Sequence, residues 1–333
     1  MTSGAPWADL SRPPLRTVPL RGALVVPAGP LGRIEVEETL GSTSTALAER
    51  ATADPGVWPD LSVLVAEHQD AGRGRRGRTF TTAPRAALTA SVLLRAPAGS
   101  APRLPWLPLL AGLAVVEELR RRAGVQAVLK WPNDVLLPAS PGPRADDPRV
   151  VGDGHVGGDA AAPAKVCGVL AEVLPPPAGS AATSGPVVVL GLGLNVDARV
   201  DELPTGATSL RLAGAATTDR DVLLRSVLRR FVDLYGRWRD LAAEDGAPGA
   251  VPGRDLAALT DPVREVCSTL GRRVRVELPG GEVLVGRAEA VDATGALVVR
   301  TGGGARLVTA GDVVHLRTVD GGGDGAACAA LAR

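Results

Sequence analysis

The sequence predicts an α+β fold followed by a small β-barrel, and its length of 333 residues suggests about two domains. Between residues 31 and 243, apolar runs typical of buried strands alternate with segments of helical period. Between residues 273 and 317, five short strand-like runs are separated by glycine turns, as in small barrels. These two observations put the larger, mixed domain first.

The composition predicts a soluble protein of the cytoplasm without a membrane partner. The formal net charge is +1, whereas a general nucleic-acid binder carries a surplus of basic residues over a whole face. Three cysteines form neither a CxxC pattern nor a disulfide framework, which fits a reducing compartment. No apolar run reaches membrane-spanning length, and residues 1–30 lack the features of a signal peptide.

The first elements of the chain precede a capped helix. Residues 1–30 are rich in proline, alanine and glycine without a clear period, so we expect a loose tail, too irregular for a helix-turn-helix. Residues 31–38 alternate as a strand does. The hydroxyl residues Ser42, Thr43 and Ser44 then lead into a short helix, where helix capping alone would explain them.

The stretch 61–80 combines a buried strand with a cationic loop. Its apolar start is followed by Gln69, Asp70 and a loop of alternating arginine and glycine. Glycines allow tight turns and close approach of a ligand, and arginines offer forked donors to phosphate or carboxylate. The loop therefore predicts a lid over an anionic ligand, although such repeats also occur in solvated linkers and RNA-binding segments.

The middle of the chain reads as two strands around a helix. Residues 87–95 form an apolar run, and residues 104–123 have helical period with arginines in the last turn, where cations suit the helix dipole. A strand from Val125 ends in KWPND at 130–134, and its proline forces a turn before the apolar residues 135–137.

Two proline- and alanine-rich insertions interrupt the next strands. We expect residues 138–164 and 175–185 to be disordered. Between them, residues 165–174 form the returning strand of a hairpin. Residues 187–190 form a buried strand that runs into GLGLN at 191–195, which lacks the third glycine and the helix of a dinucleotide fingerprint.

The last part of the chain changes from helical segments to short strands. Residues 219–243 read as a long amphipathic helix, and residues 255–270 include a short helical segment. The five short strands that follow contain no aromatic platform, which argues against a base-stacking module.

Polar residues stand where the apolar strands end, which predicts a single pocket at one edge of a sheet. Lys165 opens a strand and precedes Gly168, which would clear space beside it, although a strand-end lysine can also snorkel to water. Asn133 and Asp134 can form an ordinary turn or supply oxygen ligands to Mg²⁺. The pocket residues are Gln69, Lys130, Asn133, Asp134, Lys165 and Asn195.

At this point the motifs resemble those of the biotin protein ligases. The strong matches are AEHQDAGRGRRGR at 66–78, KWPNDVLL at 130–137, KVCGVLAE at 165–172 and GLGLN at 191–195, and they occur in the family's order. GSTSTALAE at 41–49 and PTGATSL at 204–210 are weaker matches.

The resemblance, over residues 31–320, implies a class II aminoacyl-tRNA synthetase/biotin synthetase-like catalytic domain. It implies a mixed, mainly antiparallel sheet with helices, then an SH3-like β-barrel. We expect a loose tail at 1–30, a catalytic domain at 31–254, a linker helix and barrel at 255–320, and a tail at 321–333. No DNA-binding domain is expected, because the N-terminal tail cannot supply one.

The resemblance also implies an ATP-dependent, two-step reaction. Biotin is adenylated to biotinyl-5′-AMP with release of pyrophosphate, and the biotinyl group is then transferred to a lysine of a biotin carboxyl carrier domain. The implied ligands are biotin, ATP and Mg²⁺, and we expect a monomer or weak homodimer. The implied catalytic residues are Lys165, Arg73 and Asp134, and Asp134 is also the candidate metal ligand. The implied biotin-binding residues are Ser42, Thr43, Ser44, Gln69, Gly72, Arg73, Gly74, Arg75, Lys165 and Gly168. The implied ATP-binding residues are Arg75, Arg78, Lys130, Asn133, Gly193 and Asn195.

Departures from the family pattern and two alternatives stay open. Ser44 stands where the family usually has asparagine, and Phe80 where it often has tryptophan. A lipoate ligase or octanoyltransferase is the related alternative, and a nucleic-acid-binding protein that uses the arginine loop is the alternative from another class. We also expect residues 72–78 to be unordered without ligand, because their arginines repel one another.

Overall fold

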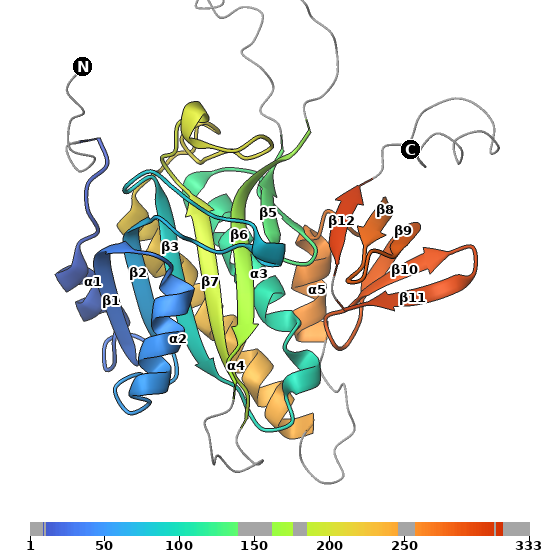
Figure 1. Ribbon diagram of the computed structural model, residues 1–333, viewed down its shortest axis with the longest axis horizontal. Coiled ribbons are helices and arrows are strands. Elements are labelled where there is room, and N and C mark those ends of the chain that lie inside the picture. The colour runs from blue at the N-terminus through green and yellow to red at the C-terminus, as the bar shows by residue number, and fades with distance from the viewer. Residues whose placement is uncertain are drawn as a thin grey trace, which may run out of the picture.

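The computed structural model describes residues 9, 11–138, 162–175, 185–245, 257–309 and 311–315. The expected disordered insertions lie outside these residues except at their ends, and the expected tail at 321–333 lies wholly outside them. The described residues form a seven-stranded sheet covered by helices and a separate five-stranded sheet (Figure 1).

The large sheet is mixed and mainly antiparallel, as the sequence analysis predicts. Its strand order is β1-β2-β3-β7-β6-β5-β4, and β1 and β2 are its parallel pair, whereas the other neighbours are antiparallel. The strands are β1 (Arg33–Leu40), β2 (Ser62–Gln69), β3 (Ala87–Arg95), β4 (Val128–Lys130), β5 (Asp134–Leu137), β6 (Ala164–Val173) and β7 (Val187–Asn195).

Helices cover both faces of this sheet because its strands are apolar on both sides. Val63 and Val65 belong to the core that contains α3 (Trp106–Glu118) and α4 (Arg220–Asp245), and a short π-helical turn, Leu119–Ala123, extends α3. Leu64 belongs to a smaller core under α2 (Thr43–Ala53) on the opposite face. No helix among the described residues is long and apolar enough to cross a membrane.

The N-terminal segment corrects the expectation of a loose tail, at least from residue 11 onward. Residues Thr17–Leu24 form α1, and Leu20 and Leu24 are buried in the large core. Arg12 is only 4% exposed, and its guanidinium forms ion pairs with acidic residues near position 200. The composition did not predict these contacts, because the few leucines of this segment are surrounded by prolines and glycines.

The C-terminal part is an antiparallel five-stranded sheet, which confirms the five short strands. Helix α5 (Ala257–Val266) leads to it, and its strand order is β11-β10-β9-β8-β12. The strands are β8 (Arg273–Glu277), β9 (Val283–Val291), β10 (Leu297–Thr301), β11 (Gly304–Val308) and β12 (Asp312–His315).

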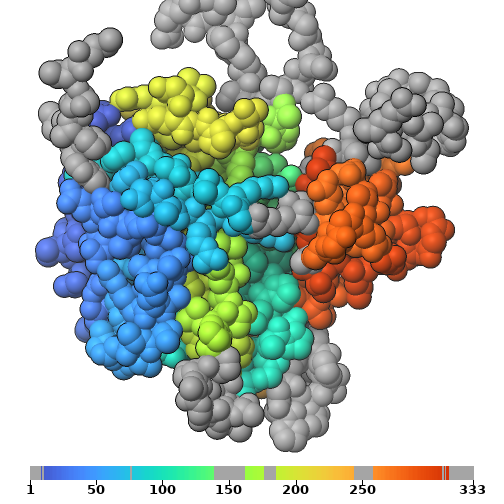
Figure 2. Space-filling view, viewed as in Figure 1, coloured from blue at the N-terminus to red at the C-terminus, as the bar shows by residue number. Residues whose placement is uncertain are grey.

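Two tryptophans of the larger domain hold the turn between β9 and β10. The indole N–H of Trp106 donates to the carbonyl of Ala293 at 3.1 Å, and that of Trp131 donates to the carbonyl of Gly295 at 3.1 Å. Trp131 directly precedes the turn that leads into β5. The small sheet, drawn in orange and red in Figure 2, is therefore fixed beside the KWPND motif.

Candidate active site

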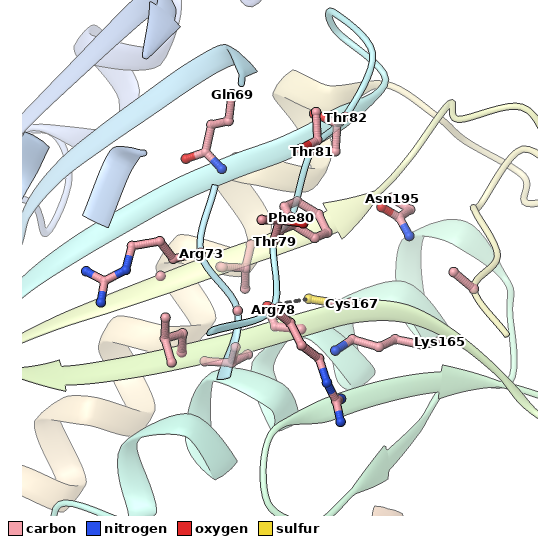
Figure 3. Close-up of a pocket in the computed structure, with 18 of the residues that line it drawn as sticks. Gln69, Arg73, Arg78, Thr79, Phe80, Thr81, Thr82, Lys165, Cys167 and Asn195 are labelled. Atoms are coloured by element: carbon pink, nitrogen blue, oxygen red, sulfur yellow. Dashed lines mark hydrogen bonds between the residues drawn. The ribbon is translucent and has the colours of Figure 1, made fainter. Parts of the chain in front are cut away.

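A cavity with a volume of about 260 Å³ lies on the α2 face of the large sheet. Strands β6 and β7 form its floor, the N-terminus of α2 closes one end, and residues 198–207 form a wall at the other end. The arginine–glycine loop lies across it. Figure 3 shows side chains from these elements pointing toward one space.

The floor is open because glycines of β6 and β7 face each other. Gly168 pairs with Gly193 across the two strands. A Cβ on Gly193 would lie 2.7 Å from the ring of Phe80, so the missing side chain is what lets this aromatic ring lie on the floor. Phe80 therefore lines the cavity near the position where the family often has tryptophan.

Hydroxyl and amide groups gather at the α2 end of the cavity. Ser42 caps α2 by accepting a hydrogen bond from the Thr45 amide at 3.4 Å, and the Thr43 amide donates to Oε1 of Gln69 at 2.7 Å. This bond orients the side-chain amide of Gln69, which still has its NH₂ donors and a second lone pair on Oε1. Ser91, from β3, donates to Oγ1 of Thr43 at 2.8 Å and lies 3.0 Å from Oγ of Ser44.

Ser91 is a residue that the sequence analysis missed. It is fully buried, and it links the two hydroxyl residues of α2 to the floor of the cavity. Two hydroxyl residues at alternate positions of the otherwise apolar run 87–95, Thr89 and Ser91, were the available signal.

The arginine–glycine loop folds back on itself through its own backbone contacts. Arg73 and Thr79 form a β-bridge, and the Gly74 amide donates to the Arg78 carbonyl at 2.6 Å. The turn Arg75–Gly77 closes the loop.

Two arginines of this loop, Arg73 and Arg75, are paired with groups outside the loop. Arg73 lies 3.0 Å from Glu172 of β6. Arg75 donates to Oδ1 of Asn133 and to the carbonyl of Gly311 in the small sheet, each at 3.1 Å. In Figure 3 the guanidinium of Arg73 points away from Lys165, whereas that of Arg78 lies on the same side as Lys165.

A β-bulge puts the Lys165 side chain into the cavity. Val135 pairs with Cys167 and Leu136 pairs with Lys165, so Val166 is an extra residue on β6. Val166 and Cys167 are both buried in the large core, and Cys167 also borders the cavity, whereas Lys165 is absent from that core and lines the cavity. The bulge thus changes the face on which the strand presents its lysine.

Lys165 and Asp134 form an ion pair in the cavity. Nζ of Lys165 lies 2.6 Å from Oδ1 of Asp134, and Gly168 leaves room for the amine, since a Cβ there would lie 2.8 Å from Nζ. Cys167 is adjacent in sequence, but burial raises the pKa of its thiol to about 12. The protonated, buried thiol is therefore not a nucleophile for this cavity.

The cavity is suited to an anionic ligand with a polar, uncharged end. Its described lining includes four cationic side chains and two carboxylates, those of Asp134 and Glu202, and Glu202 is itself paired with Arg12. The cationic residues are Arg73, Arg75, Arg78 and Lys165. Among the described residues, no group of three or more histidine, cysteine or acidic side chains is arranged to hold a metal ion by itself.

Most of the expected site residues meet in this cavity, and two do not line it. Gly72 lies at the base of the loop, where its carbonyl accepts from the Phe80 amide at 2.8 Å. Lys130 pairs with Asp134 across the β4–β5 turn but does not line the cavity. Those that line it are Ser42, Thr43, Ser44, Gln69, Arg73, Gly74, Arg75, Arg78, Asn133, Asp134, Lys165, Gly168, Gly193 and Asn195.

The wall at 198–207 was only hinted at by the sequence. The backbone of Lys165 holds it, because the Lys165 amide donates to the Gly206 carbonyl at 2.9 Å and its carbonyl accepts from the Thr208 amide at 2.8 Å. Asn195 also donates to the Thr208 carbonyl, at 3.0 Å. The weak motif PTGATSL at 204–210 falls on this part of the chain.

Comparisons with known proteins point in one direction. Residues 38–190 match the Biotin/lipoate A/B protein ligase family, and residues 269–316 match the Biotin protein ligase C terminal domain. The chain is 36% identical to the biotin–[acetyl-CoA-carboxylase] ligase of Mycobacterium tuberculosis, over 93% of this chain and 98% of that protein. It is 27% identical to the bifunctional ligase/repressor BirA of Bacillus subtilis, over 83% of this chain and 72% of that protein.

A solved structure supports the same fold. The biotin protein ligase from Aquifex aeolicus in complex with biotin and ATP aligns with a TM-score of 0.59 and 22% identity. The alignment covers 86% of this chain and 100% of that one.

Proposed function

The chain belongs to the biotin protein ligase family, and from this membership we propose that its cavity joins biotin to ATP and then passes the biotinyl group to a carrier protein. The observation that carries the proposal is the place of Lys165. Its amine lies in the same cavity as a hydroxyl–amide end and a cationic loop, and it is paired with Asp134. Such a cavity suits a ligand with a neutral polar ring and a carboxylate, next to a nucleotide phosphate.

In the first step, an oxygen of the biotin carboxylate attacks the α-phosphorus of ATP. The bond from the α-phosphorus to the bridging oxygen breaks, and pyrophosphate leaves with the electron pair. Two anions must approach, so Lys165 and Arg78 offset the repulsion between them and the charge that develops at the phosphorus. The product is the mixed anhydride biotinyl-5′-AMP.

The neutral end of the cavity binds the ureido ring of biotin. The hydroxyl groups of Ser42 and Thr43 and the NH₂ group of Gln69 supply donors and acceptors that match the ring's carbonyl and N–H groups. The Ser91 network keeps these groups in place, and its hydrogen bonds are already formed. Asn195 and the wall at 198–207 lie at the opposite end and face the nucleotide.

In the second step, the amine of a carrier lysine attacks the carbonyl carbon of the anhydride. An amide bond forms, the bond between the carbonyl carbon and the phosphate oxygen breaks, and AMP leaves with the electron pair. The attacking lysine must lose a proton, and we propose that Asp134 accepts it. The loop at 72–80 shields the anhydride from water until the carrier arrives.

The partner is a biotin carboxyl carrier domain of an acyl-CoA carboxylase, as the name of the Mycobacterium relative suggests. Because ATP and such carriers belong to the cell interior, we expect the reaction in the cytoplasm. Membership in the ligase family leaves no need for the nucleic-acid interpretation of the loop, whose Arg73 and Arg75 are engaged within the protein.

The residues present fit a magnesium ion that is bound mainly by ATP. Mg²⁺ typically uses one or two carboxylates together with substrate phosphates and water. Asp134 offers one carboxylate in the cavity, and its Oδ1 is paired to Lys165. A bound Mg²⁺ would neutralise the triphosphate, and the chain's own part would be to orient that complex against Lys165.

The test is biotin-dependent exchange of labelled pyrophosphate into ATP. We expect exchange that requires biotin, ignores lipoate and octanoate, and falls about a hundredfold or more in Lys165→Ala, because an electrostatic contact to the transition state is lost. Lys130→Ala is the matched comparison, since this lysine does not line the cavity, and we expect a much smaller loss.

The other outcomes are informative. Exchange with lipoate or octanoate in place of biotin would move the chain to the sister activity. No exchange with any acid, from folded protein with Mg²⁺ present, would contradict the proposal. Unchanged transfer of preformed biotinyl-5′-AMP by Asp134→Asn would exclude the proton-accepting role of Asp134.

A further inference from the structure

The N-terminal segment at 11–16 contacts the cavity wall through one buried arginine. Arg12 donates from Nε to Oδ2 of Asp197 at 3.2 Å and from Nη2 to the Asp197 carbonyl at 2.8 Å. It also donates to Glu202, from Nη1 to Oε1 at 3.0 Å and from Nη2 to Oε2 at 2.5 Å, and its Nε lies 4.0 Å from Oδ2 of Asp9. In Figure 2 the N-terminal segment (dark blue) meets the wall (yellow) at the upper left.

This arginine holds the wall at the end that Lys165 does not hold. The backbone of Lys165 binds the wall at Gly206 and Thr208, whereas Arg12 binds it at Asp197 and Glu202. The residues between these anchors include Leu203 and Pro204, which line the cavity. Two anchors from different parts of the fold therefore define the position of the wall.

Arg12 also controls the charge of the wall. Glu202 lines the cavity, and an unpaired carboxylate there would repel a nucleotide phosphate. Arg12 binds both carboxylate oxygens of Glu202, and its hydrogen bonds hold the pKa of this carboxyl below its usual range. Arg211 also pairs with Asp197, so Asp197 keeps a cationic partner when Arg12 is lost. Glu202, in contrast, loses the hydrogen bonds from Arg12 to both of its carboxylate oxygens.

We propose that Arg12 is a positioning residue for ATP, which fixes the wall at 198–207 through the adjacent Asp197 and neutralises Glu202 at the nucleotide end of the cavity. The inference rests on the proposed function, which puts the nucleotide beside Asn195. It makes the N-terminal segment a part of the active site, although none of its residues needs to touch the substrate.

The experiment measures pyrophosphate exchange at varied ATP and varied biotin with the full chain. Arg12→Gln should raise the KM for ATP about tenfold, the order expected for a lost charge-assisted contact, and change the KM for biotin less than about twofold. Arg16→Gln is the matched control, because Arg16 belongs to the same segment but pairs with Asp219 and Asp221 at the start of α4. It should leave both KM values unchanged.

Arg12→Lys separates positioning from folding. Lysine keeps the charge but not the fork that binds Asp197 and Glu202 together, so we expect a KM for ATP between those of the wild type and Arg12→Gln. If Arg12→Gln folds poorly, this variant carries the test.

The outcomes distinguish this inference from the proposed function. Wild-type KM values for ATP in both Arg12 variants, or equal rises for ATP and biotin, would overturn the inference while biotin-dependent exchange persists. Absence of that exchange in the wild-type protein would instead overturn the proposed function.

Discussion

Gly168 is the position where a single methyl group acts most directly on the reacting groups. A Cβ there would lie 2.8 Å from Nζ of Lys165, and that atom is the flexible end of a side chain, which can move. Gly168→Ala should therefore displace the amine without much loss of stability, within about 1 kcal/mol. We expect the kcat for pyrophosphate exchange to fall about tenfold or more, because small misplacements are costly in catalysis.

A glycine in an open environment provides the control for this prediction. Gly236 lies in α4 with nothing within 4 Å of an added Cβ. Gly236→Ala should leave the kcat for pyrophosphate exchange unchanged. It should raise the free energy of unfolding by up to about 1 kcal/mol, since alanine favours a helix. Equal kinetics in the two alanine variants would show that Gly168 does not set the position of Lys165.

At the scale of single residues, the sequence predicted which side chains line the cavity better than it predicted their hydrogen-bond contacts. Lys165, Asp134 and Gln69 were all expected in one pocket, and all line one cavity. Ser91 was missed because the run 87–95 was interpreted as an apolar strand, although Thr89 and Ser91 stand at alternate positions and so share one face. Lys130 was expected in the pocket because it ends an apolar strand, and a strand end does not say which face of the sheet the side chain occupies.

Among the elements, the arginine–glycine loop depends on an ion pair with the strand beneath it. Glu172→Gln removes the charge that Arg73 contacts at 3.0 Å, while the backbone bonds of the loop remain. We expect faster hydrogen exchange at the amides of Gly74 and Phe80 in the ligand-free variant, by a few-fold, because a half-exposed ion pair contributes below about 1 kcal/mol.

The matched control for the loop is another partly exposed arginine–glutamate pair. Glu37→Gln removes a contact of 3.0 Å to Arg50 on β1 and α2, away from the cavity. Glu37→Gln should leave amide hydrogen exchange at residues 72–80 unchanged. In the ligand-free wild-type protein, the Gly74 and Phe80 amides could exchange their hydrogens too fast to measure. That result would support the expectation of an unordered loop.

The elements themselves were largely predictable, and their irregularities were not. The strand at 87–95 and the helix at 219–243 follow from apolar runs and helical period, and the structure has them at Ala87–Arg95 and Arg220–Asp245. The bulge at Val166 was not predictable, because two consecutive buried residues look the same in a regular strand. Yet this bulge is what turns Lys165 into the cavity.

For the whole molecule, the order of the domains could be predicted, but not how they touch. Residues 31–38 and the five C-terminal runs have local patterns that indicate strands. The bond from Arg75 to Gly311 joins residues 236 positions apart, and the pairing of Arg12 with Glu202 joins residues 190 apart. Such contacts depend on the assembled fold, which composition and period do not describe.

The stability of the whole molecule should fall at alkaline pH because its core holds groups that resist ionisation. Burial raises the pKa values of the Cys167 thiol, to about 12, and of the Cys267 thiol and the Tyr235 hydroxyl. The unfolded chain ionises Cys167 from about pH 9, whereas the folded chain keeps its proton to about pH 12. The folded state thus binds more protons in this window, and its free energy of unfolding decreases as pH rises.

Cys167→Ala isolates the contribution of one thiol to this loss. The variant should be less stable at pH 8 because of the cavity it creates, but the difference from the wild type should shrink by about 1 kcal/mol between pH 8 and pH 10. Urea unfolding under reducing conditions measures it, with Ser226→Ala as a buried control that carries no titrating group. Parallel pH curves for the wild type and Cys167→Ala would mean that this thiol ionises as readily in the folded protein as in the unfolded chain.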